Sequence, residues 1–205
     1  VFDRWILDFD LEWSVRGTGA PTDQGNSQHS YLDFLPDDEW PLGGIPVYAP
    51  VDSYLVVALE ELNLGVVENG LNFMVSCEVT YGFNHVTNVD QRIVELLEAE
   101  GDGNWSAGPA LGGVQVDPVF FAAGDVLFRA LPIRKFASQG FDFRLNDKGH
   151  ENQFANMDRW RELDTYLHAI CPFEFYVEPL LSQLNARLES GVCPGPSQEV
   201  VGTLK

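Results

Sequence analysis

Between residues 45 and 146 the chain is a series of short runs rich in β-branched and aromatic residues. The runs cover 46–51, 54–60, 64–68, 71–79, 114–121, 126–129 and 139–145. Turn-forming sequences separate several of them, namely Glu68-Asn69-Gly70, Gly101-Asp102-Gly103-Asn104 and Ala123-Gly124-Asp125. Runs of this length between such turns are typical of strands in an antiparallel sheet. The sequence therefore predicts a mainly β protein built on an antiparallel β-sheet core.

The N-terminal segment extends the same pattern. Residues 1–16 place apolar side chains at alternate positions from Trp5 to Val15, with charged side chains such as Arg4 and Asp8 between them. This alternation predicts one long strand with one solvated face. Glycine, proline and asparagine are frequent in residues 17–28, which predicts a loop.

Three segments show helical rather than strand periodicity. Residues 89–100 have helical spacing and end at Gly101, which suits a C-cap. Residues 156–170 form an amphipathic pattern that Pro172 ends, and residues 178–189 predict a further helix. We therefore expect a β core over 1–148 and an α-helical extension with a tail over 149–205, packed on the core.

The cysteines indicate in which cellular compartment the protein is found. Cys77 lies in the apolar run 73–77 and is expected to be a buried free thiol. Cys171 and Cys193 each lie beside a proline, and we expect them to form a disulfide, which requires an oxidising compartment. The chain begins at Val1, which suggests a trimmed chain or a mature secreted form. We therefore expect a secreted or periplasmic protein.

The charge of the chain excludes several partners. With 31 acidic and 12 basic residues in 205, the formal net charge is −19, which disfavours nucleic acids and anionic membranes. No apolar run is long enough to span a bilayer. Sequences of the type GxxxxGK, GxGxxG and GxSxG are absent, so the chain has neither a phosphate-binding-loop motif nor the nucleophile motif of a serine hydrolase. The acidic surface suits cations and metal ions, or serves only solubility.

The first candidate metal ligands lie in the segment 29–33. His29-Ser30-Tyr31-Leu32-Asp33 precedes the strand-like pair that begins at Gly44-Ile45-Pro46-Val47 and runs to about Val56. An imidazole and a carboxylate four residues apart are candidate metal ligands. This segment resembles the first motif of the M23 family of zinc metallopeptidases, the lysostaphin- or LytM-like peptidoglycan endopeptidases, in which His-x-x-x-Asp is followed by "pV.A..dG.V".

The resemblance extends over about residues 27–146. Asn84-His85-Val86 is similar to the family's "Y.H" element on a strand, and Ala123-Gly124-Asp125-Val126 is similar to its "V..Gd.i" element. The family's last motif, His-x-His, corresponds to Gly140-Phe141-Asp142, so both histidines are replaced. The resemblance thus implies metal ligands at His29, Asp33 and Asp142, with His85 in the place of a catalytic histidine. It implies a sheet core of the M23 or lysostaphin-like type.

The geometry of an extended strand limits how these residues could form one metal site. In an extended strand, residues four apart lie about 13 Å from each other, so His29 and Asp33 share an ion only if the chain bends between them. Strand alternation sends Phe141, Phe143 and Leu145 to the core and places Asp142 and Arg144 together on the other face. Arg144 could then pair with Asp142 directly, in which case no cofactor binds.

The expected metal follows from the ligand types. One imidazole and two carboxylates form a harder set than the family's two imidazoles and one carboxylate. Zinc affinity should therefore fall, and Mn²⁺, Mg²⁺ or Ca²⁺ become more competitive. Catalysis would also need an open coordination position and a donor for the developing oxyanion, which Gly140 cannot supply from a side chain.

Three functions remain open from the sequence. The first is a diverged M23-like metallopeptidase-fold protein with a partial metal site and weak or no peptidase activity, in the cell envelope or outside the cell. The second is a non-catalytic domain that binds a glycan or peptide of the envelope. The third is an active metal-dependent hydrolase with an altered metal and substrate.

Overall fold

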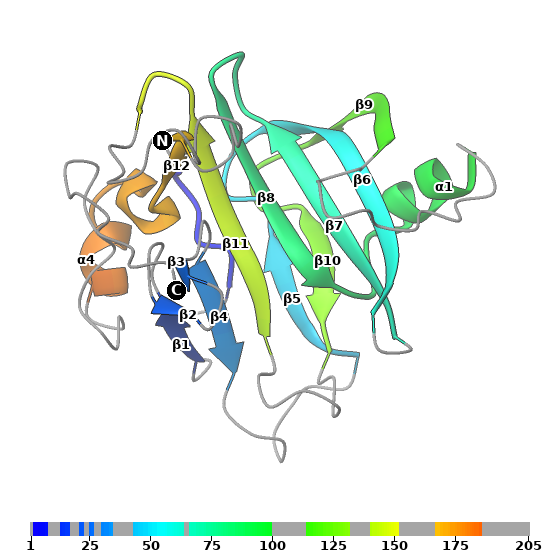
Figure 1. Ribbon diagram of the computed structural model, residues 1–205, viewed down its shortest axis with the longest axis horizontal. Coiled ribbons are helices and arrows are strands. Elements are labelled where there is room, and N and C mark those ends of the chain that lie inside the picture. Colours follow the sequence, from blue (N-terminus) through cyan, green and yellow to red (C-terminus); the bar gives the residue numbers. More distant parts are fainter. Residues whose placement is uncertain are drawn as a thin grey trace.

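The computed structural model describes residues 2–7, 13–16, 21–22, 25–26, 30–34, 43–63, 66–99, 114–131, 140–151 and 167–185. Within them, the main feature is an eight-stranded antiparallel sheet (Figure 1). Its strands are β1 (Trp13–Arg16), β4 (Ser30–Phe34), β6 (Ser53–Asn63), β7 (Val66–Met74), β8 (Val79–Val86), β9 (Val114–Phe121), β11 (Gly140–Asp147) and β12 (Ala169–Ile170). Their spatial order is β1-β4-β11-β8-β7-β6-β9, and β12 pairs with β11. The expected mainly β, antiparallel architecture is therefore confirmed.

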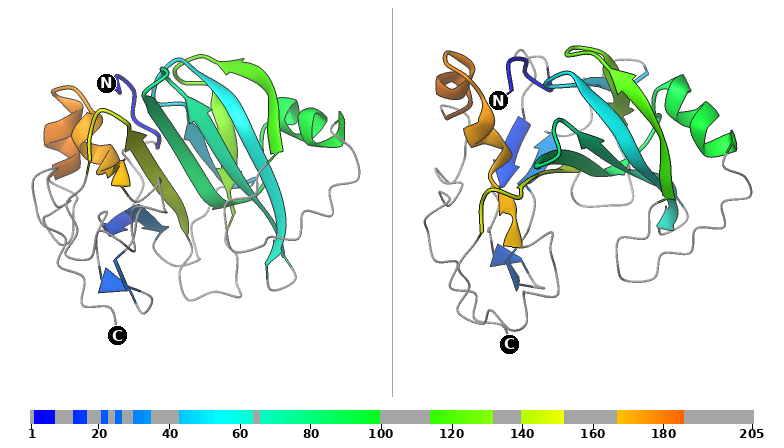
Figure 2. Two further views of the ribbon diagram at one scale, coloured as in Figure 1. Left: turned by 45° about the horizontal axis from the view of Figure 1, so that its top comes forward. Right: turned by 90° about the horizontal axis from the view of Figure 1, so that it is seen from above.

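Two short strand pairs and three helical segments complete the described fold. The pairs are β5 (Ile45–Tyr48) with β10 (Val126–Ala130), and β2 (Pro21–Thr22) with β3 (Gly25–Asn26). The helical segments are α1 (Gln91–Ala99), the 3₁₀ helix η1 (Pro172–Phe175) and α4 (Leu180–Asn185). Helices α1 and α4 lie at opposite ends of the main sheet (Figures 1 and 2). No helix among the described residues is long and apolar enough to cross a membrane.

The core lies between the main sheet and the β5–β10 pair and is dominated by aromatic rings. Phe128 of β10 contacts Phe83 of β8 and Phe141 of β11, with ring centroids 5.1 Å apart in both pairs. Phe83 also stacks on Phe143 at 5.0 Å. Such ring pairs contribute about 0.5–1.5 kcal/mol each beyond the area that they bury. The alternation predicted for β11 is confirmed, because Phe141, Phe143 and Leu145 are all buried in this core.

Residues 2–7 are not the start of a long strand, so that prediction is wrong. Phe2, Trp5, Ile6 and Leu7 are all buried, which no alternating strand with a wet face would allow. Phe2 instead forms an isolated bridge with Tyr176, and β1 is the first strand among the described residues. The N-terminal segment is thus part of the core.

Two predictions about the central hairpin are also wrong. The expected turn Glu68-Asn69-Gly70 lies inside β7, and the expected strand 71–79 is interrupted by a turn over 75–78 before β8 begins. Cys77 lies in that turn and is an exposed free thiol rather than a buried one. The turn is stabilised by the Ser76 hydroxyl, which accepts hydrogen bonds from the amides of Glu78 and Val79 at 3.2 and 3.1 Å.

The C-terminal region differs in part from the prediction. The helix expected over 156–170 does not reach its predicted end, because Ala169 and Ile170 pair with β11 as β12. Helix α4 lies within the predicted 178–189, and α1 within the predicted 89–100. Cys171 is disulfide-bonded, as expected. Its predicted partner Cys193 lies outside the described residues, as do most of the helix 156–170 and the loop 101–113.

Candidate functional site on the polar face of the sheet

The three segments with candidate chemistry lie on neighbouring strands of the main sheet. Strand β11 pairs with β4 on one side and with β8 on the other. In this register Asp142 is opposite Tyr31 of β4 and opposite Asn84 of β8, while Gly140 is opposite Asp33. Strands β4 and β11, which are more than 100 residues apart in the chain, therefore lie side by side in one sheet, with β8 next to β11.

Asp142 and Arg144 lie on the face of the sheet that is turned away from the aromatic core, which we call the polar face. Both side chains are nevertheless buried, at 2% and 4% exposure. Arg144 Nη2 donates to Asn72 Oδ1 at 2.6 Å, and Nη1 donates at 3.0 Å to the Asn84 amide oxygen in the amide orientation that satisfies both groups. Burial lowers the pKa of Arg144, and the negative charge of Asp142 opposes that shift. The guanidinium is thus anchored by two amide oxygens, one from the neighbouring strand β8 and one from β7 beyond it.

His85 reaches the polar face because β8 carries a bulge at this point. Asn69 of β7 pairs with Val86 of β8, and Leu71 pairs with Phe83. One residue of β7, Gly70, therefore faces two residues of β8, Asn84 and His85. His85 has a φ of 59°, in the left-handed region where histidine is one of the less disfavoured side chains. Bulges of this kind re-aim side chains beside functional sites. Two consecutive polar residues are consequently exposed in part, while Phe83 and Val86 on either side of them are buried.

The His85 imidazole lies between two buried carboxylates. Its Nδ1 is 2.8 Å from Glu68 Oε2, and its Nε2 is 3.7 Å from Asp142 Oδ2. The exposed fraction of the His85 side chain is 34%, against 2% for Glu68 and 3% for Asp142. Solvent therefore reaches the imidazole, while the two carboxylates are shielded from solvent. We call Glu68, His85 and Asp142 the acid–histidine–acid cluster.

Two glycines leave room for the polar side chains to lie flat on the sheet. A Cβ at Gly82 would lie 2.5 Å from Asn72 Oδ1 and 2.9 Å from Arg144 Nε. A Cβ at Gly70 would lie 3.1 Å from the side-chain amide of Asn84. The Asn-Gly sequence at 69–70 therefore serves a close approach between strands and not a turn.

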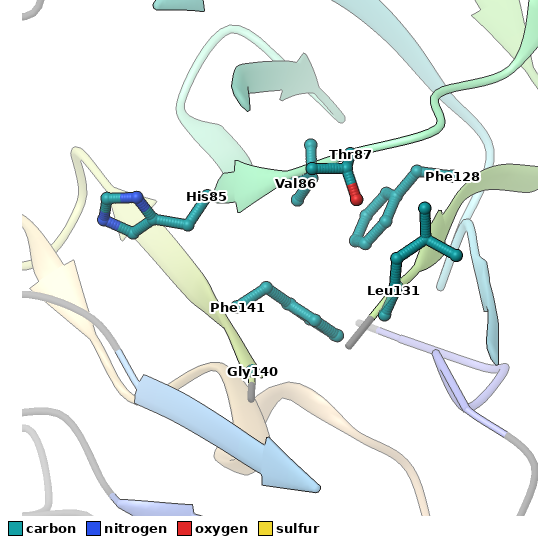
Figure 3. Close-up of a pocket in the computed structure, with 8 residues that line it drawn as sticks. His85, Val86, Thr87, Phe128, Leu131, Gly140 and Phe141 are labelled. Atoms are coloured by element: carbon teal, nitrogen blue, oxygen red, sulfur yellow. The ribbon is translucent and has the colours of Figure 1, made fainter. Parts of the chain in front are cut away.

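A small pocket lies at the end of β8 on the apolar side of the same strands. It encloses about 220 Å³, part of it open to solvent, and is lined by His85, Val86, Thr87, Phe128, Ala130, Leu131, Gly140 and Phe141. In Figure 3 the His85 imidazole extends away from the side chains of Phe128, Leu131 and Phe141. The imidazole therefore belongs to the acid–histidine–acid cluster and not to the apolar lining of the pocket.

The structure brings together two of the four residues that the sequence singled out, Asp142 and His85. Asp33 is described by its backbone alone, at a register position two residues from Asp142, and His29 lies outside the described residues. Within the described part of the chain, no group of three His, Cys, Asp or Glu side chains is arranged to hold one metal ion. The ligand set His29, Asp33 and Asp142 stays a prediction.

Sequence reasoning missed Glu68 and Asn72, the β7 contributions to this face. A signal was present, because Glu68, Gly70 and Asn72 are two residues apart and polar or small, in a strand whose other side carries Leu71 and Phe73. Interpreting Glu68-Asn69-Gly70 as a turn concealed that periodicity.

Comparison of the chain with family models, with curated protein sequences and with solved structures finds no match in any of the three.

Proposed function

We propose that this chain is a diverged M23-like metallopeptidase-fold domain that binds one divalent metal ion on the polar face and has weak or no peptidase activity. The observation that carries the proposal is that the three motif-bearing strands are neighbours in the order β4-β11-β8. Their meeting point contains the buried carboxylate of Asp142 with the His85 imidazole 3.7 Å away. A cell-envelope or extracellular role is part of the proposal and is supported by the disulfide at Cys171.

The ligands in this proposal are His29, Asp33 and Asp142, and Zn²⁺, Mn²⁺, Mg²⁺ or Ca²⁺ are the candidate ions. The fit of Asp142 is supported by its position, because a buried carboxylate with an imidazole nitrogen nearby offers an oxygen and a nitrogen to one cation. A bound metal ion would polarise a water molecule and a carbonyl group.

The weak activity follows from Gly140. This residue stands where the family has a catalytic histidine, and it lies opposite Asp33 on the neighbouring strand. Without a side chain it gives no donor to a developing oxyanion, a contribution that is worth about 10²–10³ in rate in other hydrolases.

A second candidate, a non-catalytic domain that binds a glycan or peptide, is supported by an exposed aromatic pair. Tyr54 and Phe120 are each 46% exposed and face each other across β6 and β9, with ring centroids 5.3 Å apart. The register continues through Met74 and Thr80 to Asn146, which shares a strand face with Arg144. Aromatic rings on the polar face could stack on a sugar ring or an apolar side chain.

Metal analysis of the purified protein tests the proposal. We expect about one equivalent of metal in the wild type after loading with Zn²⁺ or Mn²⁺ and dialysis, and a loss of that metal in Asp142→Asn and His29→Ala. Asp117→Asn, at an exposed position of β9, is the matched control and should retain the metal. Absence of metal in the wild type under every loading condition would contradict the proposal and favour the binding domain.

Turnover separates the weakly active protein from an active hydrolase with an altered substrate. Glycine-rich and peptidoglycan peptides are incubated with the metal-loaded protein, with the chelated protein and with the protein reloaded after chelation. Little or no turnover is the expected result. Rapid turnover that chelation abolishes and metal restores would show that the protein is an active hydrolase.

A further inference from the structure

We propose that His85 is itself a metal ligand together with Asp142, and that Glu68 is the residue that positions it. This inference deepens the proposed function and rests on it, because both require an ion at Asp142. It differs from the role that the resemblance assigns to His85, which is that of a catalytic histidine beside a metal held by other residues.

The contact with Glu68 sets the chemistry of the imidazole. A carboxylate oxygen accepts hydrogen bonds, so at 2.8 Å from Glu68 Oε2 the His85 Nδ1 carries the proton. In the neutral imidazole the lone pair is then on Nε2, the atom that faces Asp142, and a metal ion that binds there displaces any proton on Nε2. Metal-bound histidines commonly donate their other ring N–H to a carboxylate in this way, which fixes the tautomer and the ring orientation.

The separation between His85 and Asp142 suits two ligands of one ion. At 3.7 Å, Nε2 and Oδ2 are too far apart for a hydrogen bond. Ligand distances of about 2.1 Å from a common ion would give an angle of about 120–125° between these two atoms, roughly 15° wider than in a regular tetrahedral site.

The backbone supports a dedicated role for His85. A regular strand would turn its side chain into the aromatic core, and only the bulge with its left-handed residue brings it to Asp142. Uncommon backbone conformations of this kind are concentrated at functional sites. Coordination by His85 would also remove it as a free donor, which gives a second reason for weak peptidase activity.

The test is a calorimetric titration of metal-free protein with Zn²⁺ and Mn²⁺. His85→Asn is the informative variant, because asparagine also tolerates the left-handed backbone, so we expect the fold to be retained. We expect His85→Asn to weaken binding at least 100-fold and Glu68→Gln to weaken it 10- to 100-fold. His150→Asn, a histidine in the turn after β11, is the matched control and should bind as the wild type does.

A direct readout accompanies the titration. In the wild type, Zn²⁺ should shift the ¹⁵N resonance of His85 Nε2 while Nδ1 retains its proton. Wild-type affinity in His85→Asn with an unshifted His85 resonance would overturn the inference, while loss of binding in Asp142→Asn and His29→Ala would leave the proposed function intact. Absence of metal binding in the wild type would overturn both. Weakened binding in His85→Asn with unchanged binding in His29→Ala would support the inference and exclude His29 as a ligand.

Discussion

At the scale of single residues, Gly82 is the position where the polar face has least room. An added Cβ would meet Asn72 Oδ1 at 2.5 Å and the backbone oxygen of Leu71 at 2.6 Å. We expect Gly82→Ala to destabilise the protein by about 1–3 kcal/mol, because overpacking displaces backbone and hydrogen-bonded groups. Urea unfolding measures this change.

Gly70→Ala is the graded comparison for Gly82→Ala. In Gly70→Ala the added Cβ would lie 3.1 Å from the side-chain amide of Asn84, which is able to move. The loss of stability should therefore be clearly smaller than at Gly82. Equal losses would mean that the side chains on this face are less tightly fixed than we describe.

Ser53 and Tyr81 form a buried hydrogen bond that links the end of β6 to β8. Their hydroxyl groups are 2.7 Å apart, and burial raises the pKa of Tyr81. Ser53→Ala and Tyr81→Phe should each cost about 1–3 kcal/mol, since each leaves the other hydroxyl buried. The double variant should cost less than the sum of the two, as a double-mutant cycle in urea would show. Simple additivity would indicate that the two groups do not stabilise each other.

Residues of the polar face differ in how far the sequence predicts them. Asp142 and Arg144 follow from alternation, because Phe141, Phe143 and Leu145 leave them no place in the core. Glu68 and His85 do not follow, because a bulge and a left-handed residue depend on how β7 and β8 pair. Pairing of this kind is a tertiary property that local sequence patterns do not contain.

At the scale of elements, α1 begins with a cap that also docks the helix. Asp90 Oδ1 accepts hydrogen bonds from the Arg92 backbone amide at 2.9 Å and from Arg92 Nε at 2.8 Å. The same guanidinium reaches Asp125 at 3.1 Å and lies 4.0 Å from the centre of the Phe121 ring. Asp90 therefore satisfies an otherwise unpaired helix amide and orients the arginine.

We expect Asp90→Ala to lower the free energy of unfolding by about 0.5–2 kcal/mol. Asp90→Asn keeps a capping oxygen but loses the charge, so it should cost less. Chemical denaturation followed by circular dichroism gives both values. A cost in Asp90→Asn as large as that in Asp90→Ala would assign the effect to the ion pair with Arg92 and not to the cap.

Elements with strong local signals are the ones that the sequence predicts well. Helix α1 and strand β11 have clear periodicity, and both lie where it places them. Residues 2–7 and the 68–70 segment mislead because their surroundings override a local pattern. Phe2 and Trp5 are buried against Tyr176 from the far end of the chain, and Glu68 is held by His85. The strand order β1-β4-β11-β8-β7-β6-β9 is set by such distant contacts.

At the scale of the whole molecule, the net charge of −19 should control stability at low ionic strength. Like charges repel one another more in the compact state than in the unfolded chain. Raising NaCl from about 10 to 150 mM shortens the Debye length from about 30 to 8 Å. The melting temperature should therefore rise, by about 2–4 °C for each 1 kcal/mol gained. A fall in melting temperature would indicate that attractive surface ion pairs outweigh the repulsion.

Strand β8 also fixes the distance between a thiol that can be labelled and the candidate metal site. Cys77, an exposed free thiol, lies in the turn directly before β8, and His85 lies near the opposite end of that strand. Eight residues of strand span roughly 26 Å. A nitroxide attached to this thiol would be a fixed distance from Mn²⁺ at the imidazole, so pulsed electron paramagnetic resonance would locate the ion without any measurement of turnover.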